Sequence, residues 1–402
     1  MNASADTRND DTWIPVITDR AEKGLVSVVI PTYNRAYVLR SAIDSVLAQT
    51  YRPVEILIAD DGSTDGTRQI VEQYGPPVRY LHQPNAGVSA ARNLALRHAR
   101  GEFVALLDSD DWWREWKLEV QVALLRARPE VGMVWTDMSA VNDGGQILHE
   151  HYLRKMYSAY QHVRIDAVCQ SSGLVSHLVC PAPPSIGERA YYVGDFGPHM
   201  LLGSLVHTST VLVRRERLAT VGGFDESLEI AGEDYDFHLR TCLAGPVAFI
   251  DAASTGYRVG AHDQLTVNSN EIYIARNTLA TLLRWLDRSD ARVALPEAVV
   301  EGRLARCHAW LGKAELSQGN GKEARRHLWR TLRLNPTQPR LLALVLLSWL
   351  PYSLYLAAQR WAAVLRGPGS ARRRARQQPG VADAQPLNTL REIAHQRMPL
   401  KK

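Results

Sequence analysis

"FVALLDSDDWW", residues 103–113, is the stretch that decides the fold of this chain. Val104–Leu107 is an apolar run of the kind found in strands that are buried on both faces. Asp108, Asp110 and Asp111 follow this run with no turn residue between. Because a strand that ends in charged residues must deliver them to an edge of its sheet, the stretch predicts a buried strand with a polar site at its end.

Three earlier segments repeat the pattern of an apolar strand followed by a helix. The strands are "LVSVVIPTY", "VEILIADD" and "VRYLHQ", and the helices are "AYVLRSAIDSVLAQT", "TRQIVEQYG" and "GVSAARNLALRHAR". This alternation predicts right-handed βαβ units in a Rossmann-like, mostly parallel sheet flanked by helices, which is an α/β fold. Ligands of such sheets bind beyond the carboxyl ends of the strands. Polar residues follow three strands there: Thr32, Tyr33 and Asn34; Asp60 and Asp61; Asp108 and Asp110.

Changes in composition divide the chain into segments. We predict a flexible N-terminal tail over 1–24, the α/β domain over 25–268, a helical region over 269–340, an apolar helical segment over 341–366 and a basic tail over 367–402. Inside the first domain, "EVGMVWTDMSAV" is expected to be a strand with Asp137 at its tip, and "VAFIDAASTGYRVG" to supply two short strands. The stretch 145–203 shows no pattern that assigns it.

Two features of the C-terminal part have alternative interpretations. "LGKAELSQGNGKEARRHLWRTLRLNP" has the spacing of one tetratricopeptide-type repeat, but a single copy favours a helical hairpin packed on the main domain. "LLALVLLSWLPYSLYLAA" carries no charge, and five arginines follow between 366 and 376. The segment is interpreted as an interfacial anchor on an anionic membrane surface, with a buried core hairpin and a true membrane span as the alternatives.

The composition is that of an ordinary globular protein. The 402 residues are 46% apolar and 22% charged, with a net charge of +5 that alone does not distinguish nucleic acid, membrane and anionic substrates. The four cysteines form no CxxC pair, which argues against a zinc module and fits a reducing compartment. No positively charged segment leads into an apolar run near residue 1. We expect a cytoplasmic protein, peripheral on the inner face of the cytoplasmic membrane, with no nucleic-acid partner.

The carboxylates after residue 107 predict a cation site. Asp108 and Asp110 are two residues apart, so in extended chain both side chains point to the same side. Two carboxylates placed in this way bind Mg²⁺ or Mn²⁺ and leave positions open for phosphate oxygens. The alternative is an acidic turn that only caps the next helix. Asp111 is expected to be such a cap, because Trp112–Arg126 has a helical pattern.

Other polar residues are candidates for contacts with a nucleotide or an acceptor. Asp60 or Asp61, with Pro31, Thr32 and Tyr33, could recognise a base and a ribose, although a helix-capping loop also explains the acids.

Arg92 could pair with a phosphate or with Asp108, or could be solvated. Glu233 and Asp234 begin a helix, where the dipole keeps a carboxylate ionised, so one of them could be a general base; helix capping is the alternative.

Taken together, six segments resemble glycosyltransferase family 2, whose members have the GT-A fold. They are "VSVVIPTYNR", "IADDGSTDGT", "NAGVSAARNLAL", "GEFVALLDSDDWW", "GGFDE" and "EDYDFHLR", in family order over residues 25–265. The resemblance implies a nucleotide-sugar donor linked to UDP, GDP or dTDP, and transfer with inversion to a glycan or lipid-linked acceptor. It implies bacterial cell-surface polysaccharide, lipopolysaccharide or other glycoconjugate biosynthesis as the setting.

The resemblance also implies a role for individual residues. Pro31, Thr32, Tyr33, Arg35, Asp60, Asp61, Arg92, Asp108 and Ser109 would bind the donor, Asp108 and Asp110 the metal, with His262 as a further ligand; Asp234 would be the base, supported by Glu233.

"TLLRWLDR" lacks the glutamine of the QxxRW-like motif of polymerising members, with Thr281 in its place, so a single-transfer enzyme is favoured over a polymer synthase. The alternatives are a nucleotidyltransferase, for which the first strand lacks a phosphate-binding glycine loop, and a non-catalytic scaffold with a degenerate domain.

Overall fold

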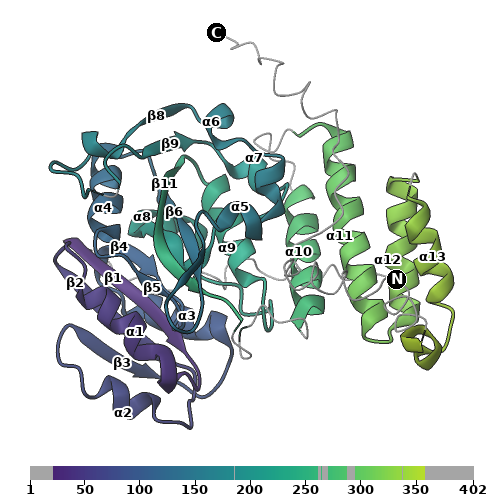
Figure 1. The fold of residues 1–402 in the computed structure, drawn as a ribbon, viewed down its shortest axis with the longest axis horizontal. Helices are drawn as coiled ribbons and strands as arrows, with labels where there is room; N and C mark the ends of the chain where they lie inside the picture. Colours follow the sequence, from purple (N-terminus) through teal and green to yellow (C-terminus); the bar gives the residue numbers. More distant parts are fainter. Residues whose placement is uncertain are drawn as a thin grey trace, which may run out of the picture.

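The computed structural model describes residues 21–184, 186–260, 264, 270–287, 295–336 and 338–357. These residues form a mixed, mostly parallel central sheet flanked by helices, with a row of C-terminal helices beside it (Figure 1). The predicted α/β fold is therefore confirmed. The expected basic tail, 367–402, and the expected N-terminal tail up to residue 20 lie outside the described residues.

The sheet runs in the order β3-β2-β1-β4-β10-β6-β11-β9-β8. Strands β3, β2, β1 and β4 pair in parallel, as do β6 and β11, and β10 joins the two groups antiparallel to both. The carboxyl ends of β1, β2 and β4 therefore meet at one edge. The bounds are β1 Glu22–Thr32, β2 Val54–Asp60, β3 Val78–His82, β4 Gly101–Leu106, β5 Trp112–Trp113, β6 Met133–Val141, β7 Ile147–His149, β8 Ser171–Leu174, β9 Ala190–Gly194, β10 Val211–Arg214 and β11 Val247–Arg258.

Helices cover both faces of the sheet, because successive side chains of a strand point to opposite faces and both faces are apolar here. On β1, Val26, Val28 and Ile30 belong to the hydrophobic cluster that contains α1 and α4, whereas Val29 belongs to the cluster that contains α3 and α9. Strands buried on both faces read as continuous apolar runs, which is why the sequence reveals them. The flanking helices are α1 Ala36–Leu47, α2 Thr67–Val71, α3 Val88–His98, α4 Lys117–Ala127, α8 Arg215–Val221 and α9 Glu233–Leu243.

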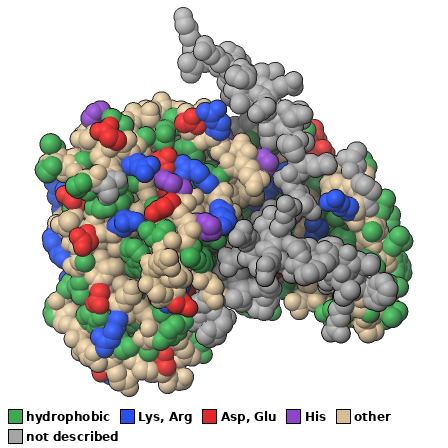
Figure 2. Space-filling view, in the orientation of Figure 1, with side chains coloured by type: hydrophobic (Ala, Val, Ile, Leu, Met, Phe, Trp, Pro, Cys, Tyr) green, Lys and Arg blue, Asp and Glu red, His purple; other side chains and the backbone are tan. Residues whose placement is uncertain are grey.

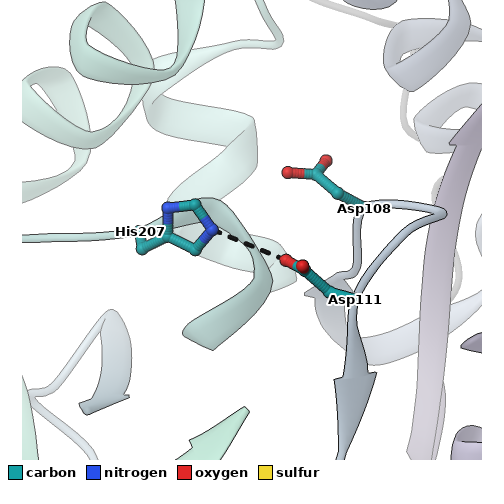
Figure 3. Close-up of side chains that lie close together, drawn as sticks. All are labelled: Asp108, Asp111 and His207. Atoms are coloured by element: carbon teal, nitrogen blue, oxygen red, sulfur yellow. Dashed lines mark ion pairs between the residues drawn. The ribbon is translucent and has the colours of Figure 1, made fainter. Parts of the chain in front are cut away.

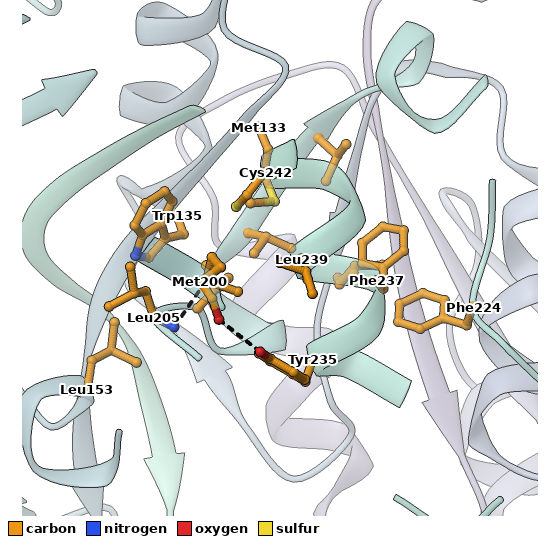
Figure 4. Close-up of a cluster of buried hydrophobic side chains, with 14 of the residues drawn as sticks. Met133, Trp135, Leu153, Met200, Leu205, Phe224, Tyr235, Phe237, Leu239 and Cys242 are labelled. Atoms are coloured by element: carbon orange, nitrogen blue, oxygen red, sulfur yellow. Dashed lines mark hydrogen bonds between the residues drawn. The ribbon is translucent and has the colours of Figure 1, made fainter. Parts of the chain in front are cut away.

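The stretch 145–203, which the sequence left unassigned, forms short elements around β9 and packs against α9. Met200 lies beside Leu239, and the Tyr235 hydroxyl donates to the Met200 carbonyl at 2.9 Å (Figure 4). The stretch therefore supports the helix that begins with Glu233. Its helical elements are α5 Leu153–Met156, η2 Ser158–Gln161, α6 Ile165–Val168, η3 Val175–His177 and α7 Gly197–Met200, and η4 Thr208–Thr210 follows it.

The C-terminal helices continue the core of the α/β unit. Ile272, Ala275 and Leu279 of α10 belong to the same buried cluster as Phe237 of α9. Farther out, α12 and α13 have a small cluster of their own. No helix in the described ranges has both the length and the apolar character needed to cross a bilayer. The bounds are α10 Glu271–Leu286, α11 Glu297–Ser317, α12 Gly321–Leu334 and α13 Pro339–Leu347.

The helix predicted over Trp112–Arg126 is present as α4, Lys117–Ala127, but its predicted start is wrong, and Asp111 is not its cap. The two tryptophans form β5, which pairs with β11, and the helix begins only at Lys117. The Trp113 indole donates to the Ser209 carbonyl at 2.7 Å and is buried, so this packing overrides the helical pattern.

Two strand predictions also need correction. Asp137 lies in the middle of β6 rather than at its tip, and its buried carboxylate accepts hydrogen bonds from the Met138 and Leu153 amides. The stretch expected to hold two short strands is the single strand β11, whose pairing with β6 changes register twice. These irregularities explain the break that the sequence suggested.

Helix α10 holds the loop that leads into α9. The Asn277 amide donates to the Glu229 carbonyl at 3.0 Å and to the Ala231 carbonyl at 2.7 Å. Gly232, the next residue, has φ +97°, and a side chain added there would lie 3.1 Å from Asn277 Cβ. The backbone just before Glu233 is thus fixed by a residue of the C-terminal helices.

We expect Asn277→Ala to lower the free energy of unfolding by about 1–3 kcal/mol, because it leaves two carbonyls without their donors. Urea titration measures this loss, and faster amide exchange over 229–232 locates it. Lys313→Ala, at an exposed position of α11, is the control and should change stability by less than about 0.5 kcal/mol. An unchanged stability of the Asn277 variant would contradict the supporting role of α10.

Candidate active site

A buried guanidinium joins three elements at the carboxyl edge of the sheet. Arg92, in α3, is 3% exposed. It donates to Asp108 Oδ1 at 2.7 Å and to Glu233 Oε1 at 2.5 Å. Its guanidinium carbon lies 5.0 Å from the centre of the Phe224 ring. Arg92 is therefore not solvated, and it connects the acids after β4 to the acids that begin α9.

Charge and burial set the protonation of this group. Burial opposes ionisation of Asp108, but Arg92 and His207 outweigh it and lower the pKa of this carboxyl. Burial, together with the neighbouring Asp234, raises the pKa of Glu233 to about 7, although Arg92 acts in the opposite direction. One guanidinium faces more than one carboxylate, so the last of them ionises with difficulty.

Asp234 lies at the N-terminus of α9 and is half-buried. Its Oδ1 accepts the amide hydrogen of Tyr235 at 2.7 Å. In the part of the chain that the structure describes, no cation is within ion-pair distance of its carboxylate. Asp234 is therefore a carboxylate without a paired cation beside Glu233, which is an arrangement suited to a proton acceptor.

The loops after β1 and β2 form a rim that internal hydrogen bonds hold in place. Asp60 accepts the Ser63 amide hydrogen at 2.9 Å and the Tyr80 hydroxyl at 2.5 Å. Asp61 accepts the Ala86 and Gly87 amides at 3.0 and 2.8 Å, in the loop that leads into α3. Both carboxylates thus have partners within the protein, and Asp61 also orients the start of the helix that carries Arg92.

The remaining residues expected to bind the donor lie at the carboxyl ends of β1 and β4. Pro31 and Ser109 are buried, and Tyr33 presents an exposed ring just beyond β1. Thr32 is buried, and its hydroxyl has no hydrogen-bond partner among the described residues. The end of β1 therefore combines an exposed aromatic ring with a buried hydroxyl that has no partner among the described residues. His262 lies outside the described residues.

The acids of "DSDD" have different partners. Asp110 pairs with Arg35 at 2.7 Å, and its side chain is 14% exposed. Asp111 points instead into the core, where its Oδ2 accepts the Ser209 hydroxyl at 2.6 Å and lies 3.5 Å from His207 Nε2 (Figure 3). Asp108, Asp111 and His207 each place one possible metal-ligand atom within 4.8 Å of the others. Asp110 does not belong to this group.

Burial also shifts the pKa of both members of the Asp111–His207 pair. It raises the pKa of Asp111 to about 6, with Asp110 and Asp108 acting in the same direction and His207 against it. For His207, burial opposes protonation, but Asp111 and the other acids outweigh it and raise the pKa of the ring. Each partner therefore stabilises the charge of the other.

Sequence reasoning missed His207 and Ser209, and it gave Asp111 a different role. Both missed residues lie about a hundred positions after Asp111, in "LVHTSTVLV", where nothing but a lone histidine before an apolar run distinguishes them. The signal that identifies them is the register of β10 between β4 and β6, which carries this segment to the end of β4.

Comparison with known proteins places this architecture among glycosyltransferases. The description "Glycosyl transferase family 2" matches residues 27–175. Over 266 residues the chain is 32% identical to "Uncharacterized glycosyltransferase RP339" of Rickettsia prowazekii (strain Madrid E), an alignment that covers 66% of this chain and 74% of that protein. Against four other curated rickettsial glycosyltransferases, the chain spans between 28% and 66% of their length.

A second sequence match covers a part of the chain, and a structural match concerns its fold. The chain is 33% identical over 152 residues to the Escherichia coli "UDP-Glc:alpha-D-GlcNAc-diphosphoundecaprenol beta-1,3-glucosyltransferase WfgD", covering 37% of this chain and 57% of WfgD. The crystal structure of S. aureus TarS 1–349 with UDP-GlcNAc matches with a TM-score of 0.51 at 19% identity, over 80% of this chain and 84% of that one. The second match concerns the fold alone.

The raised pKa of Glu233 predicts how stability depends on pH. A carboxyl with a folded-state pKa of about 7 and an ordinary value of 4.5 stabilises the fold fully at low pH, and this contribution is lost as the pH rises through 7. Between pH 5 and 8, the free energy of unfolding of the wild-type protein should fall on the order of 1 kcal/mol relative to that of Glu233→Gln.

Urea unfolding at several pH values measures the difference between the two proteins. Glu229→Gln, an exposed position in the preceding loop, is the control and should run parallel to the wild type. If the stability of the wild type relative to Glu233→Gln increased with pH, the raised pKa of Glu233 would be contradicted.

Proposed function

The chain belongs to glycosyltransferase family 2, and we propose that it transfers one sugar from a nucleotide-diphosphate donor to an acceptor hydroxyl, with inversion at the anomeric carbon. The observation that carries the proposal is the pair of carboxylates that begins α9. Glu233 is tied through Arg92 to Asp108, whereas Asp234 has no cationic partner within the described ranges. This arrangement supplies one structural acid and one proton acceptor at the same edge of the sheet.

The proposed reaction uses residues of the chain in separate roles. Asp234 accepts the proton of the acceptor hydroxyl as that oxygen attacks the anomeric carbon from the face opposite the nucleotide. Glu233 and Arg92 hold the start of α9 in register with the end of β4, so that base and donor meet at a fixed distance. The exposed ring of Tyr33 packs on the nucleobase, and the Thr32 hydroxyl is a hydrogen-bonding group beside it.

A divalent cation, Mg²⁺ or Mn²⁺, fits the acids at the end of β4. Asp108 keeps one carboxylate oxygen that Arg92 does not occupy, and buried acids lie next to it. When bound, such a cation supplies neutralising charge for the diphosphate that departs. Arg35 and Arg92 lie within hydrogen-bond distance of Asp110 and Asp108, so they reduce the repulsion between these acids and an incoming diphosphate.

We further propose a lipid-linked glycan as the acceptor, in the synthesis of a bacterial cell-surface polysaccharide. WfgD, which is similar to 37% of the chain, has a diphosphoundecaprenol-linked sugar in its name. An acceptor with such an anchor lies at a membrane surface. A peripheral enzyme on the inner face of the cytoplasmic membrane meets this requirement.

A surface of the C-terminal helices is suited to this location. Leu346 and Trp349 are 71% and 70% exposed at the end of α13, and other exposed apolar residues lie close to them in the sequence. Figure 2 shows hydrophobic side chains gathered at this end of the molecule. Arg325 lies over the Trp349 ring at 4.1 Å. Apolar side chains bordered by arginines match an anionic bilayer surface.

Asp234→Asn is expected to lower kcat for sugar transfer at least about 100-fold, because an amide cannot accept the hydroxyl proton. Its dissociation constant for the donor should be unchanged. A panel of UDP-, GDP- and dTDP-sugars, screened by thermal shift and then by release of the nucleoside diphosphate, identifies the donor for this measurement. The matched control is Asp166→Asn, which changes an exposed aspartate of α6. Near-normal turnover of the Asp234 variant would exclude it as the base.

Leu346→Ser combined with Trp349→Ser should weaken binding to vesicles that contain phosphatidylglycerol at least about tenfold, since each large apolar side chain contributes about 1.5–3 kcal/mol when buried. Flotation of the full chain with vesicles measures the partition coefficient. Leu148→Ser, which changes an exposed leucine of β7, should leave it unaltered. Equal flotation of the double variant and the wild type would refute this membrane surface.

A further inference from the structure

We propose that Ile230 contacts the acceptor and helps to select it, by presenting an apolar surface beside the base. The inference rests on the proposed function, because it takes Asp234 as the group that meets the acceptor hydroxyl. It concerns a residue that the reaction described above does not use. Two properties of Ile230, its backbone conformation and its exposure, are unfavourable for the fold alone.

Ile230 has a backbone conformation that its residue type rarely adopts. Its φ is +71°, which lies in the left-handed region. The Ala231 amide donates to the Glu229 carbonyl at 2.9 Å, so a three-residue turn closes around Ile230. Turns of this kind with a positive φ at the centre are rare and strained. A β-branched residue at such a position is an outlier, because its side chain crowds the backbone.

Helix α10 maintains this conformation. The Asn277 side-chain amide donates to the carbonyls of Glu229 and Ala231, at 3.0 and 2.7 Å. These two carbonyls flank Ile230 in the chain. A strained residue persists only where its surroundings hold it firmly. The turn is therefore a built feature of the fold rather than a loose surface loop.

Both ends of the loop are anchored as well. Phe224, before the loop, stacks on Phe237 with 4.3 Å between the ring centres (Figure 4). Tyr235, after the loop, donates its hydroxyl hydrogen to the Met200 carbonyl at 2.9 Å. Because the loop is fixed at both ends and in its middle, it presents its central residues in a defined position relative to the start of α9.

The side chain of Ile230 does not contribute to a core. It is 40% exposed and belongs to none of the hydrophobic clusters that the described residues form. Exposed apolar side chains are common, but a glycine here would avoid both the exposed apolar area and the backbone strain. The chain thus retains two unfavourable features that one substitution would remove. Residues of this kind are expected where function opposes stability.

Ile230 also lies close to the group that would meet the acceptor. It is four residues before Asp234, so their Cα atoms are at most about 14 Å apart, and the turn shortens this distance. The donor nucleotide, by contrast, is expected at the ends of β1 and β2. An isoleucine side chain has no hydrogen-bonding group, so it offers only an apolar surface. A face of the acceptor sugar that carries C–H groups fits such a surface.

The competing explanation is that Ile230 is an incidental surface residue whose strain has no role. It predicts that a residue suited to a positive φ improves stability without lowering activity. A contact with the acceptor predicts instead that the same substitution improves stability and weakens acceptor binding. The two explanations therefore differ in the acceptor KM of a stabilised variant.

The test compares Ile230→Gly, Ile230→Asn and Ile230→Val in the full chain. Glycine and asparagine adopt a positive φ readily, so their midpoints of urea unfolding should be at least as high as that of the wild type. With α-D-GlcNAc-diphosphoundecaprenol as the probe acceptor, KM should rise at least about tenfold in both. Valine lacks only one methylene, so its KM should rise less than about fourfold. The matched control is Ile147→Ala, at an equally exposed isoleucine of β7, and it should leave KM unchanged.

Donor hydrolysis without an acceptor is the second measurement, followed by release of the nucleoside diphosphate. It should stay within about twofold of the wild type in all three variants, because Ile230 does not hold Asp234. An unchanged acceptor KM in a stabilised Ile230→Gly would overturn the proposal. An equal loss of hydrolysis and transfer would also overturn it, since that result indicates a structural role. A wild-type chain that releases no nucleoside diphosphate from any sugar nucleotide would refute the proposed function and this inference with it.

Discussion

The arrangement of the site depends on one buried ion triad. Arg92 reaches from α3 to Asp108, 16 positions later at the end of β4, and to Glu233, 141 positions later at the start of α9. A fully buried cation is unfavourable unless it is paired on several sides, so this geometry is tightly specified. Asp61 orients the loop before α3, and Asn277 holds the loop before α9. Asp61 and Asn277 thus act on the triad indirectly, by fixing the loops that carry its members.

The C-terminal helices belong to this arrangement as well. Arg284 of α10 pairs with buried Asp225 at 2.8 Å, in the segment that leads to α9, and Asn277 acts on the same segment. The apolar face of α10 completes the cluster that buries α9. A site that needs a precise position for Asp234 is therefore supported by helices outside the sheet. The division at residue 268, drawn from composition, separates two parts that share a core.

Much of the fold could be predicted from the sequence, because strands buried on both faces give unbroken apolar runs and the acids directly follow them. The position of Asp108 follows from this pattern, whereas Glu233 and Asp234 are predicted from the start of an amphipathic helix. The role of Asp111 could not be predicted, since the tryptophans after it suit a helix equally well and only pairing with β11 makes them a strand. His207 could not be found either, because its neighbour in space is 96 positions away and depends on an antiparallel strand inserted in the sheet.

The balance of charge at the carboxyl edge is what the proposed cation would have to offset. Arg92 pairs with both Asp108 and Glu233, and Arg35 pairs with Asp110. Asp111 and Asp234 follow directly on these acids in the chain. Even with His207 protonated, the acids keep an excess of negative charge in a largely buried place. The nucleoside diphosphate of the proposed donor would bring further negative charge to the same edge. A divalent cation of the kind proposed above would offset the repulsion that these charges exert at short range and low dielectric.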